Sequence, residues 1–126
     1  MIQDCYSEYA SFTSGGLEWA IDSLSDNPQL QPELADFLKS CDLELDGNIA
    51  DFVTVRAQGQ LVACAGMGEN VIKCVAVSET LRGQNITLRL ISDVMHLAAD
   101  MGRYQLFLYT KPENVETFAS CGFYPL

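Results

Sequence analysis

The spacing of apolar residues predicts two helices in the first third of the chain. Leu17, Ile21 and Leu24 recur at helical intervals, which predicts a short helix that ends at Asn27-Pro28. A second helix is predicted over about 31–41, where a proline and a glutamate suit the first turn and apolar residues follow on one stripe. Residues 17–41 are therefore expected to be mainly helical.

After these helices the pattern changes to that of strands. Residues 52–55 predict a strand, and the paired strand over 61–66 follows a tight turn near Ala57–Gln60, so the two form a β-hairpin. A second turn is expected over 66–70, where two glycines and an asparagine occur. The third strand of this meander is Val71–Val77, which is apolar on both faces, as a central strand should be.

The last third predicts a helix, a strand and a shorter helix. Apolar residues repeat at three and four from 86 to 101, with Gly102 as the expected stop. Tyr104–Thr110 is expected to be a buried strand, and a helix that begins at 111–113 ends at Gly122, before a further strand at 123–124. The side chains of that helix expected to face inward are Val115, Phe118 and Ala119.

This order of elements predicts an α+β fold, with a mixed, mainly antiparallel central sheet flanked by helices. The chain has 126 residues, 48% of them hydrophobic, which is ample for the core of a single domain over 1–126. No apolar run approaches the roughly 18 residues that a membrane span requires, so no membrane partner is expected.

The charge balance excludes one large class of partner. The chain carries 17 acids against 7 bases, a formal charge of −10, and nucleic-acid affinity rests largely on neutralised phosphates. A nucleic-acid partner is therefore not expected, whereas an anionic small ligand requires that some bases gather at its site. The N-terminus is polar and acidic, without the features of a signal peptide, which indicates a cytoplasmic protein.

The cysteines predict neither a disulfide framework nor a metal site. They are five in number, far apart and without a C-x-x-C pair, which suits reduced thiols. Those in the strand-like runs are expected to be small buried hydrophobes. The cysteines are Cys5, Cys41, Cys64, Cys74 and Cys121.

The candidate chemistry lies between Val71 and Ile91, where an apolar strand runs into a polar turn with a glycine and then into the long helix. Such a turn directs backbone N–H groups and the positive end of the helix dipole to one place, where a phosphate or pyrophosphate can bind. Arg82 adds a positive charge inside the turn. The first candidate ligand is therefore coenzyme A.

The same turn and order of elements resemble the GNAT acyl-CoA acyltransferases, whose motif Q/R-x-x-G-x-G/A begins the long helix. Arg82 and Gly83 match the motif, whereas Asn85 and Thr87 depart from its small residues. The resemblance implies that six residues bind the cofactor, namely Arg82, Gly83, Gln84, Asn85, Ile86 and Thr87. It also implies contacts from Asn114 and from the main chain of Val75, Ala76 and Val77 to the pantetheine arm.

Residues 30–126 are more specifically similar to the N-terminal domain of the citrate lyase ligase family, and residues 1–29 are less clearly assigned. The similar segments are Asn70–Glu79, Leu106–Asn114 and Phe118–Phe123. Enzymes of that family use ATP and acetate to acetylate the thiol of the CoA-derived prosthetic group on the acyl-carrier subunit of citrate lyase. Their ATP site lies in a second domain with an H-x-G-H motif.

This chain has one histidine, His96, so the resemblance implies that ATP is used only through a domain absent here. GNAT folds also continue beyond the C-G-F segment with a further strand. The chain is therefore expected to be part of a longer enzyme that lacks its last strand here, or to receive that strand from a second copy.

Two functions follow from the resemblance. Many GNAT enzymes place a tyrosine where this chain has Phe118, and phenylalanine cannot protonate a departing thiolate. The first hypothesis is a module that binds the CoA-like group without catalysis. The alternative is an acetyltransferase that moves acetyl from acetyl-CoA to an amine, with Glu69 or Glu79 as the base. Arg89 is expected to face the ligand or solvent.

Overall fold

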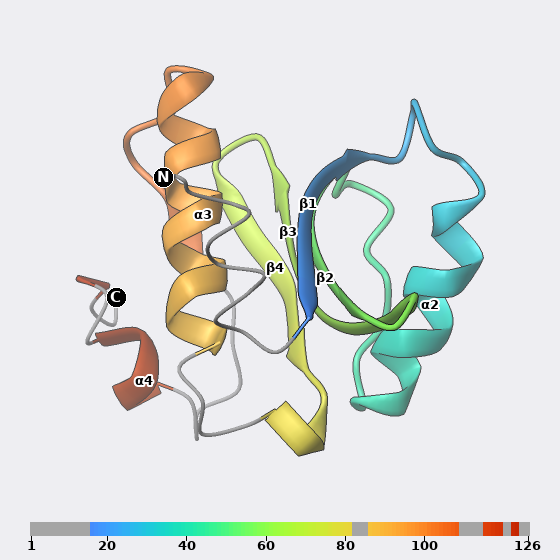
Figure 1. Cartoon of the computed structure of the whole chain (residues 1–126). Helices are drawn as coiled ribbons and strands as arrows, with labels where there is room; N and C mark the ends of the chain where they lie inside the picture. The colour runs from blue at the N-terminus through green and yellow to red at the C-terminus, as the bar shows by residue number, and fades with distance from the viewer. Residues whose placement is uncertain (1–15, 82–85, 109–114, 120–121, 124–126) are drawn as a thin grey trace, which may run out of the picture.

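The computed structural model describes residues 16–81, 86–108, 115–119 and 122–123. They form one five-stranded sheet in the order β1-β2-β3-β4-β5, with helices on both faces (Figure 1). The strands are β1 (Leu17–Ser23), β2 (Asp51–Ala57), β3 (Gln60–Gly68), β4 (Val71–Val77) and β5 (Phe107–Leu108). The helices are α2 (Leu30–Ser40), the single turn η1 (Glu79–Leu81), α3 (Ile86–Asp100) and α4 (Val115–Ala119).

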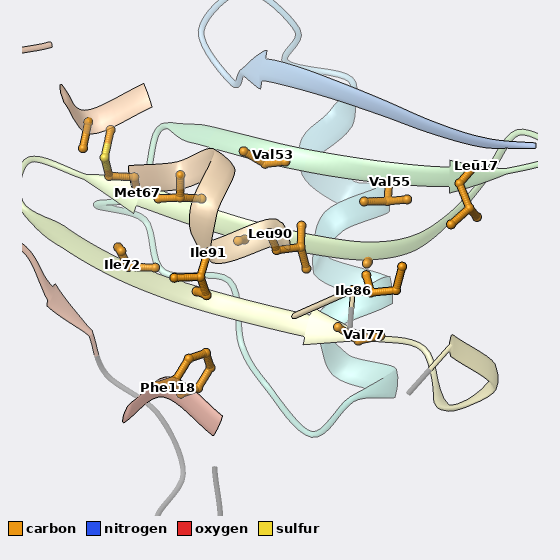
Figure 2. Close-up of a cluster of buried hydrophobic side chains, with 14 residues drawn as sticks. Leu17, Val53, Val55, Met67, Ile72, Val77, Ile86, Leu90, Ile91 and Phe118 are labelled. Atoms are coloured by element: carbon orange, nitrogen blue, oxygen red, sulfur yellow. The ribbon is translucent and has the colours of Figure 1, made fainter. Parts of the chain in front are cut away.

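The sheet is mixed, because β1 to β4 pair antiparallel and β5 pairs parallel to β4. Helix α2 lies on one face of the sheet and α3 on the other, with α4 on the same side as α3 (Figure 1). Each face has its own apolar core. The core under α3 includes Val55, Val77 and Leu90 (Figure 2), and the core under α2 includes Leu34 and Phe52. The predicted α+β class is confirmed.

The predicted helix over 17–24 is wrong, since these residues form β1 at the edge of the sheet. Leu17 pairs with Ala57 and Ser23 with Asp51, so the whole segment follows β2. Leu17 is buried, whereas Ile21 is 60% exposed. In the predicted helix both residues would have faced the core. Pairing with β2 outweighs the local helical spacing, as tertiary context commonly does.

The predicted hairpin is confirmed, with Gln58 and Gly59 as a two-residue turn in which both residues have positive φ. The second turn is shorter than predicted. Strand β3 continues to Gly68, so Gly66 belongs to the strand and Glu69 and Asn70 make the turn. The central strand has the predicted bounds, although it is the fourth strand of the sheet rather than the third.

Helix α3 also agrees with the prediction and ends where a glycine permits it. Gly102 has a φ of 78°, a conformation that side chains disfavour. The Arg103 amide donates to the Ala98 carbonyl at 2.8 Å, so the last turn keeps its hydrogen bonds. Ile86, Leu90 and Val94 are buried on the side that faces the sheet.

The last elements differ in part from the predictions. Tyr104 is 82% exposed and lies outside β5, so the expected buried strand does not begin there. In α4 Phe118 is buried as expected, but Ala119 is exposed. Phe123 is not in a strand, and Tyr124 lies outside the described residues, as do 109–114.

Residues 43–49, here called the crossing segment, pass over β4 and β3 on the α2 face before β2 begins. Two glycines in β3 leave the space for it. A Cβ on Gly68 would lie 2.3 Å from the Asn48 carbonyl oxygen, and one on Gly66 would lie 2.5 Å from a methyl carbon of Ile49. The close approach of the Asn48 main chain to Gly68, and of the Ile49 side chain to Gly66, therefore favours glycine at both positions.

Candidate functional site

The candidate site lies where β4 leads through η1 towards α3. The Ser78 amide donates to the Val62 carbonyl at 2.7 Å, and the Leu81 amide donates to the Ser78 carbonyl at 2.9 Å, which turns the chain away from the sheet. Val77 and Ile86 belong to the same core cluster, so the end of β4 lies beside the start of α3 (Figure 2). Thr87, in the first turn of α3, is half-buried.

The main chain near the end of β4 has a defined direction. Adjacent residues of a strand direct their backbone N–H and C=O groups to opposite edges. Since the Ser78 amide bonds to β3, the backbone groups of Val77 point to the other edge of β4, where β5 lies. Among the described residues, β5 pairs with Val71 and Ile72. The described part of that ladder therefore does not extend to Val75–Val77.

The side chains of the same three residues are committed to packing. Ala76 is 5% exposed and joins the core under α2, whereas Val77 is 7% exposed and joins the core under α3. Val75 is partly buried against the core under α3. Whatever these residues contribute to a site, they contribute through backbone N–H and C=O groups.

Strand β4 contains a β-bulge at Cys74 and Val75, where this segment begins. Lys73 pairs with Gly66 and Ala76 with Cys64, so Cys74 and Val75 both face the one intervening residue of β3. Cys74 has a φ of 57°, in the left-handed region that only glycine adopts readily. This bulge could not be predicted from the sequence, because nearly all of β4 is apolar and the alternation of its side chains cannot be followed.

Half of the site residues predicted from the sequence lie outside the described residues. These are Arg82, Gly83, Gln84, Asn85 and Asn114. Of the other five, Val75, Ala76 and Val77 lie together at the end of β4, and Ile86 and Thr87 begin the next helix. The structure brings these two groups together at one end of the sheet. The binding role of all ten remains a proposal.

Arg89 is partly exposed, with 28% of its side chain accessible, and it packs against the edge strand β1. Its guanidinium carbon lies 3.9 Å from the centre of the Trp19 ring, on β1. Its Nε also lies 3.9 Å from a carboxylate oxygen of Asp93, one turn along α3. Arg89 therefore joins α3 to the edge strand.

The two acids considered as a base lie at opposite ends of β4. Glu69 is in the turn that precedes the strand, where its carbonyl accepts a hydrogen bond from Arg103 Nη1 at 2.8 Å. Glu79 is exposed in η1, which follows the strand. They cannot both serve one site, and only Glu79 lies near the predicted phosphate turn.

Phe118 is 4% exposed and packs in the core under α3, at the position where many GNAT enzymes have tyrosine. His96 is exposed on α3. Tyr109 and Cys121 lie outside the described residues. A general acid is thus not provided at position 118.

The three cysteines in the described part of the chain are free thiols, as predicted. Burial raises the pKa of the Cys64 thiol far above its ordinary value, and it raises the pKa of Cys74 as well. Protonated, buried thiols are poor nucleophiles. These two cysteines are therefore structural, in agreement with the expectation for small buried hydrophobes.

Other classes of site receive no support from the described residues. Within them no group of three or more His, Cys, Asp or Glu side chains could hold a metal ion. None of the helices in the described ranges has both the length and the apolar character needed to cross a bilayer.

Comparison with curated proteins identifies relatives of considerable similarity. The chain is 42% identical over 91 residues to [citrate [pro-3S]-lyase] ligase of Escherichia coli K12, an alignment that covers 72% of this chain and 26% of that protein. It is 46% identical over 89 residues to the Haemophilus influenzae protein of the same name, which covers 70% and 27%. The chain therefore spans about a quarter of the length of these relatives, and the resemblance to citrate lyase ligase is confirmed.

Comparison with solved structures supports the fold. An acetyltransferase of Trypanosoma brucei superposes with a TM-score of 0.69 at 20% identity, covering 87% of this chain and 94% of the other. The family model described as "Acetyltransferase (GNAT) family" matches residues 3–124, nearly the whole chain. The chain belongs to the GNAT acetyltransferase family.

Proposed function

We propose that this domain binds the CoA-like phosphopantetheine group of the acyl-carrier subunit of citrate lyase and presents its thiol without transferring acetyl itself. One observation carries the distinction between binding and catalysis. Phe118 is buried in the core where many GNAT enzymes have a tyrosine that protonates the departing thiolate. A phenylalanine ring packs there but has no proton to give.

The partner is inferred from the relatives. Two proteins with 42% and 46% identity are named as ligases of citrate (pro-3S)-lyase. Since the chain spans about a quarter of their length, the ligase activity belongs to a longer enzyme, which uses ATP and acetate to acetylate the thiol. In this proposal ATP binds to another domain, and the whole enzyme acts in the cytoplasm.

The proposal assigns the ligand to the end of β4. The pantetheine arm runs along the main chain at Val75–Val77, where the backbone groups of Val77 point to the edge on which β5 lies. The pyrophosphate occupies the turn at 82–85, where Arg82 supplies charge and the 15-residue helix α3 supplies the positive end of its dipole. Ile86, Thr87 and Asn114 complete the contacts.

A second function has its own support. The GNAT acetyltransferase model matches residues 3–124, and the fold is shared with acetyltransferases of known structure. The domain would then move acetyl from acetyl-CoA to an amine. Glu79, exposed in the turn after β4, is the better placed of the two acids to act as the base.

Calorimetric titration with CoA, dephospho-CoA and acetyl-CoA, combined with an assay for free CoA in the presence of candidate amines, tests the proposal. Binding without release of CoA supports the binding module. Release of CoA that is lost in Glu79→Gln and kept in Glu69→Gln supports the transferase. If none of the three ligands binds, both functions are excluded for this domain.

A further inference from the structure

The bulge in β4 is held in an unfavourable conformation. Cys74 adopts a φ of 57° although it carries a side chain, and such a conformation persists only where the surrounding structure fixes it. Among the other residues with positive φ, Gln58 and Glu69 lie in tight turns. Cys74 lies inside a central strand, so its conformation requires specific contacts.

Those contacts come from β3 and from the crossing segment. The Cys64 thiol donates a hydrogen bond to the Cys74 carbonyl at 3.3 Å. The Cys74 thiol in turn donates to the Glu44 carbonyl at 3.5 Å. Cys74 is therefore hydrogen-bonded both to the Cys64 thiol on β3 and to the main chain of the crossing segment.

An ion pair fixes the crossing segment to the residue before the bulge. Lys73 Nζ lies 2.8 Å from one carboxylate oxygen of Asp46, and the other oxygen accepts the Asn48 amide at 2.8 Å. Both Asp46 oxygens thus have a partner, one of them Lys73 on β4 and the other the Asn48 amide within the crossing segment. The contacts of Asn48 and Ile49 with Gly68 and Gly66 hold the same segment against β3.

The position of the bulge decides which way the next residues face. Ile72 belongs to the core under α3 and Cys74 to the core under α2, although residues two apart in a regular strand share a face. After the bulge, Val77 is again under α3. Without the extra residue the register would slip by one, and the backbone groups of Val75–Val77 would change edges.

We propose that Cys64, Cys74 and the crossing segment, through the Asp46–Lys73 pair, are positioning elements that fix the β4 bulge and thereby aim the main chain of Val75–Val77 at the CoA-type ligand. None of these side chains touches the ligand in this arrangement. The inference rests on the proposed function for its consequence, but the bulge and its supports exist in the ligand-free protein. The two can therefore be tested separately.

The first test uses NMR of the ligand-free chain. The Cα chemical shift and the amide–Hα coupling of residue 74 report its φ, and the amide shifts of Val75–Val77 report their environment. Cys74→Gly should keep the positive φ, whereas Cys74→Val should lose it, because a β-branched residue disfavours the left-handed region. Unchanged amide shifts of Val75–Val77 in Cys74→Val would overturn the proposal without any ligand.

The second test measures CoA affinity by calorimetry. Cys74→Val should weaken CoA by about tenfold or more, whereas Cys74→Gly, which keeps the positive φ but loses the bond to the Glu44 carbonyl, should weaken it less. Cys64→Ala should also weaken CoA, and Cys64→Ser, which keeps a donor for the Cys74 carbonyl, should restore it. Cys41→Ala is the matched control, since Cys41 lies at the end of α2 and should leave the affinity unchanged.

A charge-matched pair tests the crossing segment independently and avoids the core. Asp46→Asn removes the charge that holds Lys73, and Glu33→Gln removes the charge that holds Arg56 in a bidentate pair on β2. Asp46→Asn should shift the amides of Val75–Val77 and weaken CoA, whereas Glu33→Gln should do neither. Equal effects of the two variants would overturn the proposal.

The outcomes separate the two claims. If the natural chain binds no CoA while the amide shifts respond as described, the proposed function fails and the positioning role stands as a property of the fold. If CoA binds and all the variants bind it equally, the positioning role fails and the proposed function stands.

Discussion

The guanidinium carbon of Arg89 lies 3.9 Å from the centre of the Trp19 ring, which joins the first turn of α3 to the edge strand β1. A cation over an indole face contributes about 0.5–2 kcal/mol, depending on how well water is excluded. The Arg89 side chain is 28% exposed, so the interaction energy is expected to lie between the values for exposed and for buried pairs. The contact thus explains how an edge strand is held to the helix that begins at the candidate site.

A double-mutant cycle of Trp19→Leu and Arg89→Met is expected to give a coupling energy of about 0.5–2 kcal/mol in the free energy of unfolding. Urea titrations of the natural chain, the two single variants and the double variant provide it. Arg103→Met in place of Arg89→Met is the control, because Arg103 bonds to the Glu69 carbonyl instead. Additive effects of the Trp19 and Arg89 changes would contradict the contact.

Arg82→Ala is expected to weaken phosphate-bearing ligands by about 1–3 kcal/mol, the usual scale for a charge-assisted hydrogen bond. Calorimetric titration with CoA at one fixed salt concentration measures the change. Arg103→Ala removes the same charge near the opposite end of β4 and should leave the affinity nearly unchanged. If Arg82→Ala binds CoA as the natural chain does, Arg82 is not part of the site.

Phe118→Ala is expected to lower the free energy of unfolding by about 3–5 kcal/mol, since it empties a large buried volume. Tyr104→Ala is the matched aromatic control, and at 82% exposure it should change stability by no more than about 0.5 kcal/mol. Urea denaturation followed by circular dichroism measures both. Similar small effects for the two variants would show that α4 does not pack on the core as described.

Gly68→Ala is expected to destabilise the chain by about 1–3 kcal/mol, because the added carbon would lie 2.3 Å from the Asn48 carbonyl oxygen. Gly47→Ala, in the same crossing segment, meets nothing within 4 Å and should be neutral or slightly stabilising. Thermal unfolding of the two variants side by side makes the comparison. A stable Gly68→Ala would contradict the close passage of the crossing segment over β3.

Asp93→Asn is expected to stabilise the chain near neutral pH. Burial raises the pKa of Asp93, and the charges of Arg89 and His96 only partly oppose this. The native state therefore holds the proton more tightly, and the stability contributed by this carboxyl is present below its ordinary pKa of 3.8 and lost as pH rises through the native pKa.

Unfolding titrations of Asp93→Asn and the natural chain from pH 3 to pH 8 check the sign. The gain in the variant should disappear below about pH 4, where both states of the natural chain bind the proton. Glu33→Gln should show the opposite behaviour, because the Arg56 pair lowers the pKa of Glu33. A loss of stability in Asp93→Asn at neutral pH would contradict the account.

Most of the fold could be predicted from the sequence, because local signals and packing agree there. The Gln58-Gly59 turn and the stop of α3 at Gly102 each contain a glycine with positive φ, and the bounds of β4 follow from its apolar run. Strand β1 could not be predicted, since Leu17, Ile21 and Leu24 have helical spacing. Only its pairing partner β2 shows that the segment is extended.

The candidate site was predicted less completely than the fold. The phosphate turn after Val77 is predicted from its glycine, its arginine and the helix that follows, all of which are local signals, and residues 82–85 lie outside the described residues. The bulge at Cys74 and its bonds to Cys64 and Glu44 depend on residues far apart in the chain. In a strand that is apolar on both faces, one extra residue does not change the pattern of polar and apolar residues, so the bulge cannot be detected from the sequence.

The most direct test of CoA-type binding at the end of β4 is an NMR titration of the ¹⁵N-labelled chain with CoA, followed at single amides. The account predicts saturable shifts at Val75–Val77 and at Ile86 and Thr87, with little change at the Glu69 turn, at the opposite end of β4. Saturating CoA that leaves the amides of Val75–Val77 and of Ile86 and Thr87 unmoved would contradict it.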